Sequence, residues 1–200
     1  VPPRSVRPLW LLAGGLAAAV FAATSIGALG AAGGVHVGLS ESAAGYLIAV
    51  GGLAGLTIRL LAGLYADRAP FDSLRAVSAL VLVGGFGWLI MATDQPVAFA
   101  IGLVIANAFG WGWPGLQHLS MARRFPTSTA AASGISQTGI AAGLLIGPAV
   151  LGLLVTTAGW SWMWLSAAIA AFLGSAVVWV ASSRIPTLRV TQHAEGGDGF

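Results

Sequence analysis

Long apolar stretches, separated by short polar or turn-forming segments, run through this chain from residue 9 to residue 183. A hydrocarbon core about 30 Å thick needs roughly 20 apolar helical residues, and each stretch is about that long. Cutting the chain at the interruptions predicts six membrane-spanning helices, at residues 9–32, 43–66, 73–93, 97–121, 129–156 and 160–183. The stretches lack the alternating pattern of membrane barrel strands, so we expect an all-α integral membrane domain at residues 9–183.

Composition excludes a water-soluble fold. Of the 200 residues, 57% are hydrophobic and 8% are charged, and the mean hydropathy is +0.88, whereas soluble proteins carry about a quarter charged residues. The chain has no cysteine, so we expect no disulfide, thiol nucleophile or thiolate metal site. The absence of lysine beside abundant alanine, glycine and arginine is typical of GC-rich bacterial genes, which suggests a bacterial inner (cell) membrane.

The arginines predict the orientation of the spans. Eight of the nine lie before the first span, after the last span, or in the second-to-third and fourth-to-fifth connectors, which all fall on one side of a six-span chain. The positive-inside rule therefore places the N-terminal segment 1–8 and the polar tail 184–200 in the cytoplasm. These scattered arginines form no basic patch of the kind that binds nucleic acid.

The positions of the tryptophans predict which of them lie at the membrane interfaces. We expect indoles at the inner membrane interface from Trp10 and Trp179, and at the outer interface from Trp88, Trp160, Trp162 and Trp164.

The first apolar stretch is too long for a signal peptide and predicts a retained span. The sequence begins with Val1 and not with methionine, which leaves open a piece of a longer protein or a complete half-size protein.

A periodic motif closes the second predicted span. Gly55, Arg59, Gly63 and Asp67 recur at every fourth residue and so share one helix face, with Arg68 directly after them. Glycines at this spacing allow a neighbouring helix to approach closely. A second glycine row, in the fifth span, comprises Gly139, Gly143 and Gly147 and ends at Pro148. Because this row lies inside an apolar helix, it favours a packing surface over a ligand-binding loop.

The first motif resembles the Gly-x-x-x-Asp-Arg signature of the major facilitator superfamily, which follows the second helix of each six-helix half. The superfamily continues with a basic x-Gly-Arg-Arg run, which residues 69–72 replace here, leaving Arg75 nearby. The fifth span is similar to the superfamily's Gly-Pro helix. The fourth span lacks the arginine that is frequent in first halves, and the chain therefore resembles a C-terminal half.

The resemblance implies a three-plus-three inverted repeat, alternating access to a substrate site at mid-bilayer, and a second half as partner. That partner would be an N-terminal six-helix half or a second copy of this chain. The motif Gly55, Arg59, Gly63, Asp67 and Arg68 would act as a cytoplasmic gate, with Asp67 contacting a neighbouring helix N-terminus or an arginine. Simple solvated charges at Asp67 and Arg68 are the alternative.

Polar and indole side chains inside the spans are the candidates for a substrate cavity. Asn107, Trp111, Pro114 and His118 share one face of the predicted fourth helix, where Pro114 frees a carbonyl near Gly110. The full set of candidates is Asn107, Trp111, Trp113, Gln117, His118 and Gln137. Hydrogen bonding between helices is the alternative role for these residues, and His118 could also carry a proton.

Arg59 is the one charged residue well inside a predicted span. It could extend toward the cytoplasmic interface along its own helix, or it could contact an anion or a substrate, because charges within spans are rare and mostly functional.

The predicted function is secondary transport of a small solute, with no enzymatic activity, cofactor or metal. Two rivals stay open: a six-helix membrane subunit that does not transport, and an intramembrane serine protease built on Ser133 and His118. The sequence does not identify the substrate, the coupling ion or the direction of transport.

Overall fold

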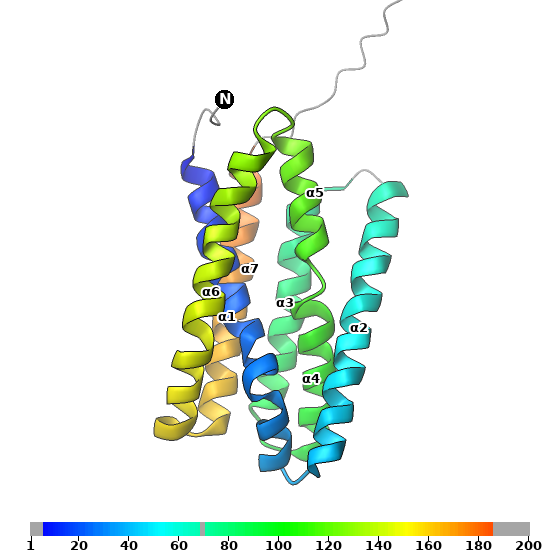
Figure 1. Ribbon diagram of the computed structural model, residues 1–200, viewed down its shortest axis with the longest axis vertical. Coiled ribbons are helices and arrows are strands. Elements are labelled where there is room, and N and C mark those ends of the chain that lie inside the picture. The colour runs from blue at the N-terminus through cyan, green and yellow to red at the C-terminus, as the bar shows by residue number, and fades with distance from the viewer. Residues whose placement is uncertain (1–5, 69–70, 186–200) are drawn as a thin grey trace, which may run out of the picture.

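The computed structural model describes residues 6–68 and 71–185, apart from the side chain of Asp67. Most of the predicted tail 184–200 and most of the segment 1–8 lie outside these residues. Within them the chain forms helices α1 (Arg7–His36), α2 (Glu41–Arg68), α3 (Ser73–Met91), α4 (Pro96–Gly110), α5 (Pro114–Arg124), α6 (Thr129–Ala158) and α7 (Trp160–Arg184) (Figure 1). Six of the resulting segments are long and apolar enough to cross a membrane, with α4 and α5 counted together, and this confirms the predicted all-helical membrane fold.

Local sequence signals set several helix ends. The Asp72 carboxylate caps α3 by accepting hydrogen bonds from the backbone N–H groups of Leu74 and Arg75. Proline stands at the first position of α4 and of α5, where a missing N–H costs no helical hydrogen bond. Gly159 has a φ of +92°, a left-handed value that glycine adopts easily, and as a single residue it joins α6 to α7.

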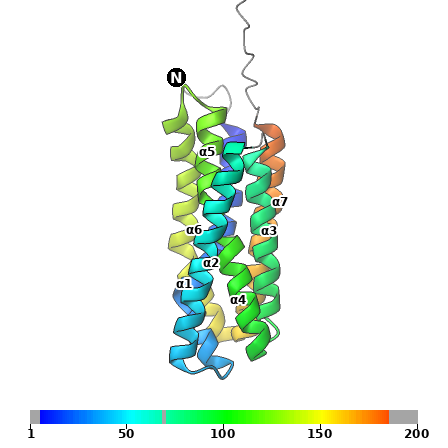
Figure 2. The same cartoon turned by 90° about the vertical axis from the view of Figure 1, so that its right-hand side faces the viewer.

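The helices pack in a pattern with internal symmetry. α1 packs along α6 and α7, while α4 with α5 packs along α2 and α3, and α3 also packs on α7 (Figures 1 and 2). Exchanging the first three spans with the last three maps the α1–α6 and α1–α7 pairings onto those of α4 and α5 with α2 and α3, and maps the α3–α7 pairing onto itself. Because the counterpart of each helix is the third span after it, the two run in opposite directions, as an inverted repeat requires.

Two tryptophans correct the predicted interfacial belt. Trp88 and Trp164 are fully buried inside the bundle. The Trp88 indole donates to the Ser25 hydroxyl at 2.9 Å, and the Trp164 ring packs edge-on against Phe99 with centroids 5.7 Å apart. The belt prediction was wrong for both residues because a position near a helix end does not reveal whether the side chain faces lipid or protein. Trp10, Trp162 and Trp179 are exposed.

The glycine row of α6 lies directly against α1. A methyl group on Gly143 would come within 2.5 Å of the Ala17 carbonyl oxygen, and one on Gly139 would overlap the Ala13 carbonyl. Gly147 is likewise closed by Thr24 and Phe21. The two backbones therefore approach as closely as glycine allows.

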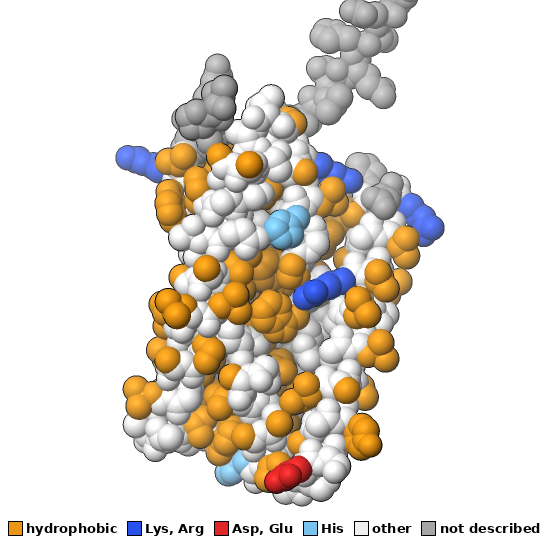
Figure 3. Space-filling view, in the orientation of Figure 1, with side chains coloured by type: hydrophobic (Ala, Val, Ile, Leu, Met, Phe, Trp, Pro, Cys, Tyr) orange, Lys and Arg blue, Asp and Glu red, His pale blue; other side chains and the backbone are white. Residues whose placement is uncertain are grey.

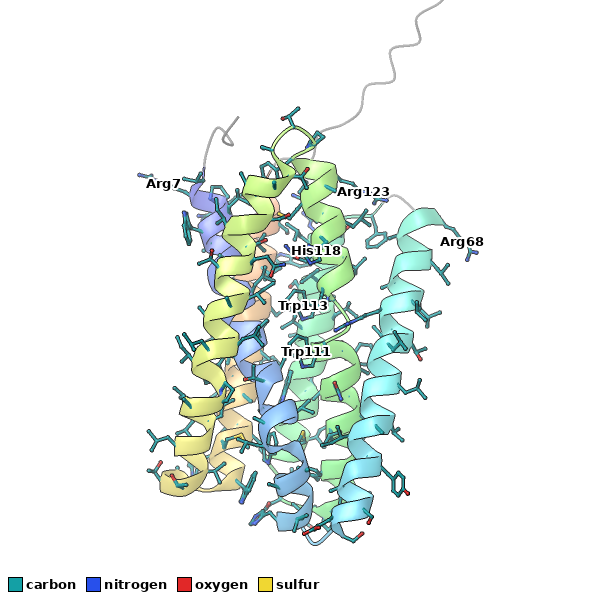
Figure 4. All side chains as sticks on the ribbon, viewed as in Figure 1. Arg7, Arg68, Trp111, Trp113, His118 and Arg123 are labelled. Atoms are coloured by element: carbon teal, nitrogen blue, oxygen red, sulfur yellow. The ribbon has the colours of Figure 1, made fainter. Side chains whose placement is uncertain are left out.

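α2 and α6 are the least buried of the apolar spans. Large apolar side chains cover their outer surfaces, among them Tyr46, Leu53, Leu60, Leu145 and Leu153. Figure 4 shows Arg7, Arg68 and Arg123 at the same end of the bundle, which is called the arginine end below. The opposite end carries His36, Glu41 and Asp94.

Candidate functional site

The predicted fourth span is not one continuous helix. α4 ends at Gly110 and α5 begins at Pro114, so Trp111, Gly112 and Trp113 interrupt it. Proline removes one backbone donor, and its ring clashes with the carbonyl four residues earlier, here that of Gly110, which kinks or breaks a helix. The single helical face that the sequence predicted for this span is therefore broken at its middle.

Side chains donate hydrogen bonds to two of the carbonyl groups at the break, those of Gly110 and Trp111. The Trp113 indole donates to the Gly110 carbonyl at 2.7 Å, which is the carbonyl that Pro114 was predicted to free. Arg59 on α2 donates from Nε to the Trp111 carbonyl at 2.9 Å. The Trp111 indole in turn donates to the Ala23 carbonyl of α1 at 3.1 Å. The break is thus fastened to both α1 and α2.

A cavity of about 400 Å³ lies between α2 and this break. Its walls come from two elements, α2 and the end of α4, and comprise Gly52, Gly55, Leu56, Arg59, Asn107 and Trp111. The volume falls in the range of small-molecule sites, about 300 to 1,000 Å³. Figure 3 shows positive side chains at the arginine end and also halfway down this face, beside α2.

Arg59 crosses from its own helix to the break. The sequence left open an extension along α2 toward the membrane surface, but the guanidinium contacts the carbonyl of Trp111 in the next span. Among the described residues, no carboxylate lies within 4.0 Å of it. An arginine near the middle of a span costs about 2.5 to 3.5 kcal/mol on insertion scales, so its presence beside a cavity is a functional lead.

Asn107 presents a second polar group to the cavity. Its side chain makes no hydrogen bond to any described residue, although it is half-buried. Gly51 and Gly55 allow it to sit close to α2, since a methyl group on Gly51 would meet the Asn107 amide nitrogen at 3.0 Å. An amide with free donors and acceptors is therefore held beside Arg59.

The other predicted cavity residues lie outside this cavity. Trp113 is fully buried, and Gln117 is buried with its amide donating to the Ser136 hydroxyl at 2.8 Å. His118 and Gln137 form an exposed pair across α5 and α6, with 3.3 Å between their nitrogen atoms. In Figure 4, Trp111, Trp113 and His118 lie one above another along α4 and α5.

The residues of the gate motif lie in different surroundings along α2. Gly55 and Arg59 line the cavity, whereas Gly63 has open space around it and Arg68 is exposed at the arginine end. The side chain of Asp67 lies outside the described residues.

The sequence reading missed an ion pair at the arginine end. The buried Arg124 guanidinium donates to the Asp72 carboxylate at 2.5 Å and also to the carbonyls of Ser182 and Ile185. Arg123 donates to the Ala66 carbonyl of α2 at 3.0 Å. The one feature of the sequence that could have indicated this pair is Asp72 at the N-cap position of α3, in a connector on the same side of the membrane as the connector that carries Arg123 and Arg124.

The fold and the cavity define a class: a multi-pass helical membrane protein with polar groups gathered at a gap between its spans, which is typical of membrane transporters. Residues 11–198 match the sequence profile of the Major Facilitator Superfamily, and the chain belongs to that family of membrane transporters. No curated protein and no solved structure matches the chain significantly.

Proposed function

We propose that this chain moves a small solute across the membrane by alternating access, as one half of a major facilitator transporter and by its motifs the C-terminal half. The cavity at the break between α4 and α5 is the observation that carries this proposal. The cavity holds Arg59 and Asn107 away from both ends of the bundle. Polar side chains at such a depth in a membrane usually line a water-filled path.

The surroundings of the cavity support a partner half. The face that carries it is flanked by α2 and α6, which are the two least buried spans (Figure 1). A second six-helix unit on this face would cover both helices and close the cavity into a central site. The family offers two such partners, an N-terminal half and a second copy of this chain.

Reconstitution tests the proposed function. The chain is purified alone and together with a co-expressed six-helix first half, and each preparation is placed in liposomes. The liposomes are exposed to a mixed panel of small solutes, and their contents are measured by mass spectrometry. We expect at least one solute to accumulate above the level of protein-free liposomes in one preparation.

Accumulation in neither preparation would favour the rival, a six-helix subunit that does not transport. The protease alternative has less support, since His118 pairs with Gln137 and, among the described residues, makes no hydrogen bond to the Ser133 hydroxyl. Labelling of the purified chain by a serine-reactive probe would revive that alternative.

A further inference from the structure

Arg59 has most of its hydrogen-bonding capacity unused. A guanidinium carries five N–H donors, and among the described residues Arg59 makes one hydrogen bond, from Nε to the Trp111 carbonyl. That bond fixes one edge of the planar group, so the terminal nitrogen atoms stay available. No carboxylate of the described residues neutralises the charge.

The cavity around Arg59 is suited to a molecule that brings the missing negative charge. Asn107 adds an amide without a partner, and Trp111 adds apolar surface while its own N–H is already engaged with the Ala23 carbonyl. Gly52 keeps the wall on α2 open, because a methyl group there would meet no atom within 4 Å. A planar guanidinium with paired donors recognises carboxylate and phosphate groups especially well.

We propose that this cavity binds an anionic solute, whose carboxylate or phosphate group pairs with the terminal nitrogen atoms of Arg59. Asn107 hydrogen-bonds a neighbouring polar group of the solute, and Trp111 contacts its apolar part. The proposal names the substrate class of the site described above and therefore rests on the proposed function.

An anionic lipid headgroup carries the same chemistry, but the position of Arg59 favours a solute. Arg59 precedes Arg68, at the end of α2, by nine residues, which is about 13 Å of helix. Lipid phosphates lie at the membrane surface, outside the hydrocarbon core. A headgroup would have to leave that surface to reach the guanidinium.

Equilibrium binding to the purified full-length chain tests the charge preference. The probes are benzoate, phenyl phosphate and the neutral, nearly isosteric benzamide, compared at constant ionic strength in an uncharged detergent by the shift in unfolding temperature. We expect saturable binding of at least one anion, at least tenfold tighter than benzamide. Equal affinity for benzoate, phenyl phosphate and benzamide, or binding of neither anion, would overturn the proposal.

Matched variants assign the binding to this cavity. Arg59→Gln should weaken anion binding at least tenfold, whereas Arg7→Gln, which removes the same charge from an exposed position, should leave it unchanged. Arg59→Lys keeps the charge without the fork of donors and should bind with intermediate affinity. Gly52→Leu should block the cavity, while Gly45→Leu, on the same helix and also in open space, should not. Anion binding that survives Arg59→Gln contradicts the assignment.

Two further comparisons separate the possible outcomes. Vesicles of phosphatidylglycerol and of phosphatidylcholine are tested without added solute; stabilisation by phosphatidylglycerol alone that disappears in Arg59→Gln would identify a headgroup in place of a solute. Binding requires no transport, so an anion that binds through Arg59, together with no accumulation of any solute in either liposome preparation, would leave this inference standing and contradict the transport function.

Discussion

At the scale of single residues, Asp72 connects three elements of the arginine end. Its carboxylate caps α3 and also pairs with Arg124, whose side chain is 4% exposed and also donates to the end of α7. A buried arginine that loses its carboxylate keeps its desolvation cost without the attraction that offset it. The stability of this end therefore depends on one acid that resides in a connector.

Replacing Asp72 by alanine should lower the free energy of unfolding by about 2 to 4 kcal/mol, through loss of the cap and of the buried pair. Asp72→Asn should lose less, because the amide oxygen can still cap α3. The measurement is the unfolding midpoint in mild detergent. Asp94→Asn is the control, since it removes a charge from an exposed pair with His36 and asparagine tolerates the φ of +59° at this position, and such pairs contribute about 0 to 1 kcal/mol. A midpoint for Asp72→Ala equal to that of Asp94→Asn would contradict the role of Asp72.

Asp67 allows a test of the proposed gate. Asp67→Asn removes the charge and preserves the size of the side chain, so we expect solute uptake to fall at least tenfold while the amount of protein inserted in the membrane stays the same. Both quantities are measured on the same reconstituted preparation, with the equally conservative Glu41→Gln at the opposite end of α2 as the control. Wild-type uptake by Asp67→Asn would exclude the gate.

At the scale of helices, the contact between α1 and α6 depends on glycine. A methyl group on Gly139 would overlap the Ala13 carbonyl, which belongs to the α1 backbone and cannot rotate away. Gly152, on the same helix, has no atom within 4 Å of such a methyl group. The two positions differ in packing while sharing one helix.

Gly139→Ala should therefore destabilise the fold by about 1 to 3 kcal/mol, the usual cost of overpacking. Gly152→Ala should be neutral or stabilising by up to about 1 kcal/mol, since alanine is the better helix former. Unfolding midpoints of the two variants in the same detergent give the comparison. A midpoint for Gly139→Ala at or above that of Gly152→Ala would show that α1 and α6 do not pack as described.

The lengths of the apolar stretches indicated where the helices lie along the chain, but they did not indicate which side of each helix contacts the rest of the protein. The helices α6 and α7 begin at Thr129 and Trp160, where the sequence placed the starts of two spans; both starts follow turn-forming residues, which interrupt an apolar run visibly. Which side of each helix faces protein was not predictable in the same way, since lipid and protein interior are both apolar. That is why the burial of Trp88 and Trp164 came only from the structure.

The candidate site was predicted as two separate groups. Arg59 was assigned to the gate motif, with a contact to an anion or a substrate as the alternative, and Asn107 and Trp111 to a cavity. The structure brings all three to one cavity. Their meeting depends on α2 packing against α4 and on the break at residues 111–113, and neither follows from the spacing of residues along one helix. Trp113 and Gln117 were predicted from the same span but turn into the packed interior.

At the scale of the whole molecule, the charges of the two ends predict its orientation. Seven spans or five would place the arginine-bearing connectors on different sides, whereas the six described spans gather Arg7, Arg68 and Arg123 at one end. The positive-inside rule predicts that this end faces the cytoplasm.

Reporter tags inserted after His36 and after Arg124 should therefore report opposite compartments, with the tag after Arg124 in the cytoplasm. A pair of reporters active on opposite sides, such as a fluorescent protein and a periplasmic phosphatase, gives the measurement. Both tags in the same compartment would refute the six-span topology, and with it the alternating-access proposal.

The symmetry of the packing pattern makes one difference between the repeats informative. α1 and the α4–α5 span are counterparts, yet α1 is a continuous helix of 30 residues while its counterpart is broken at Trp111–Trp113. The broken span forms one wall of the cavity, and the carbonyls of Gly110 and Trp111 at its break accept hydrogen bonds from side chains, whereas α1 is unbroken and lines no part of the cavity. A mutant library meant to change which solute this protein binds should accordingly randomise the break at Trp111–Trp113 and leave α1 unchanged.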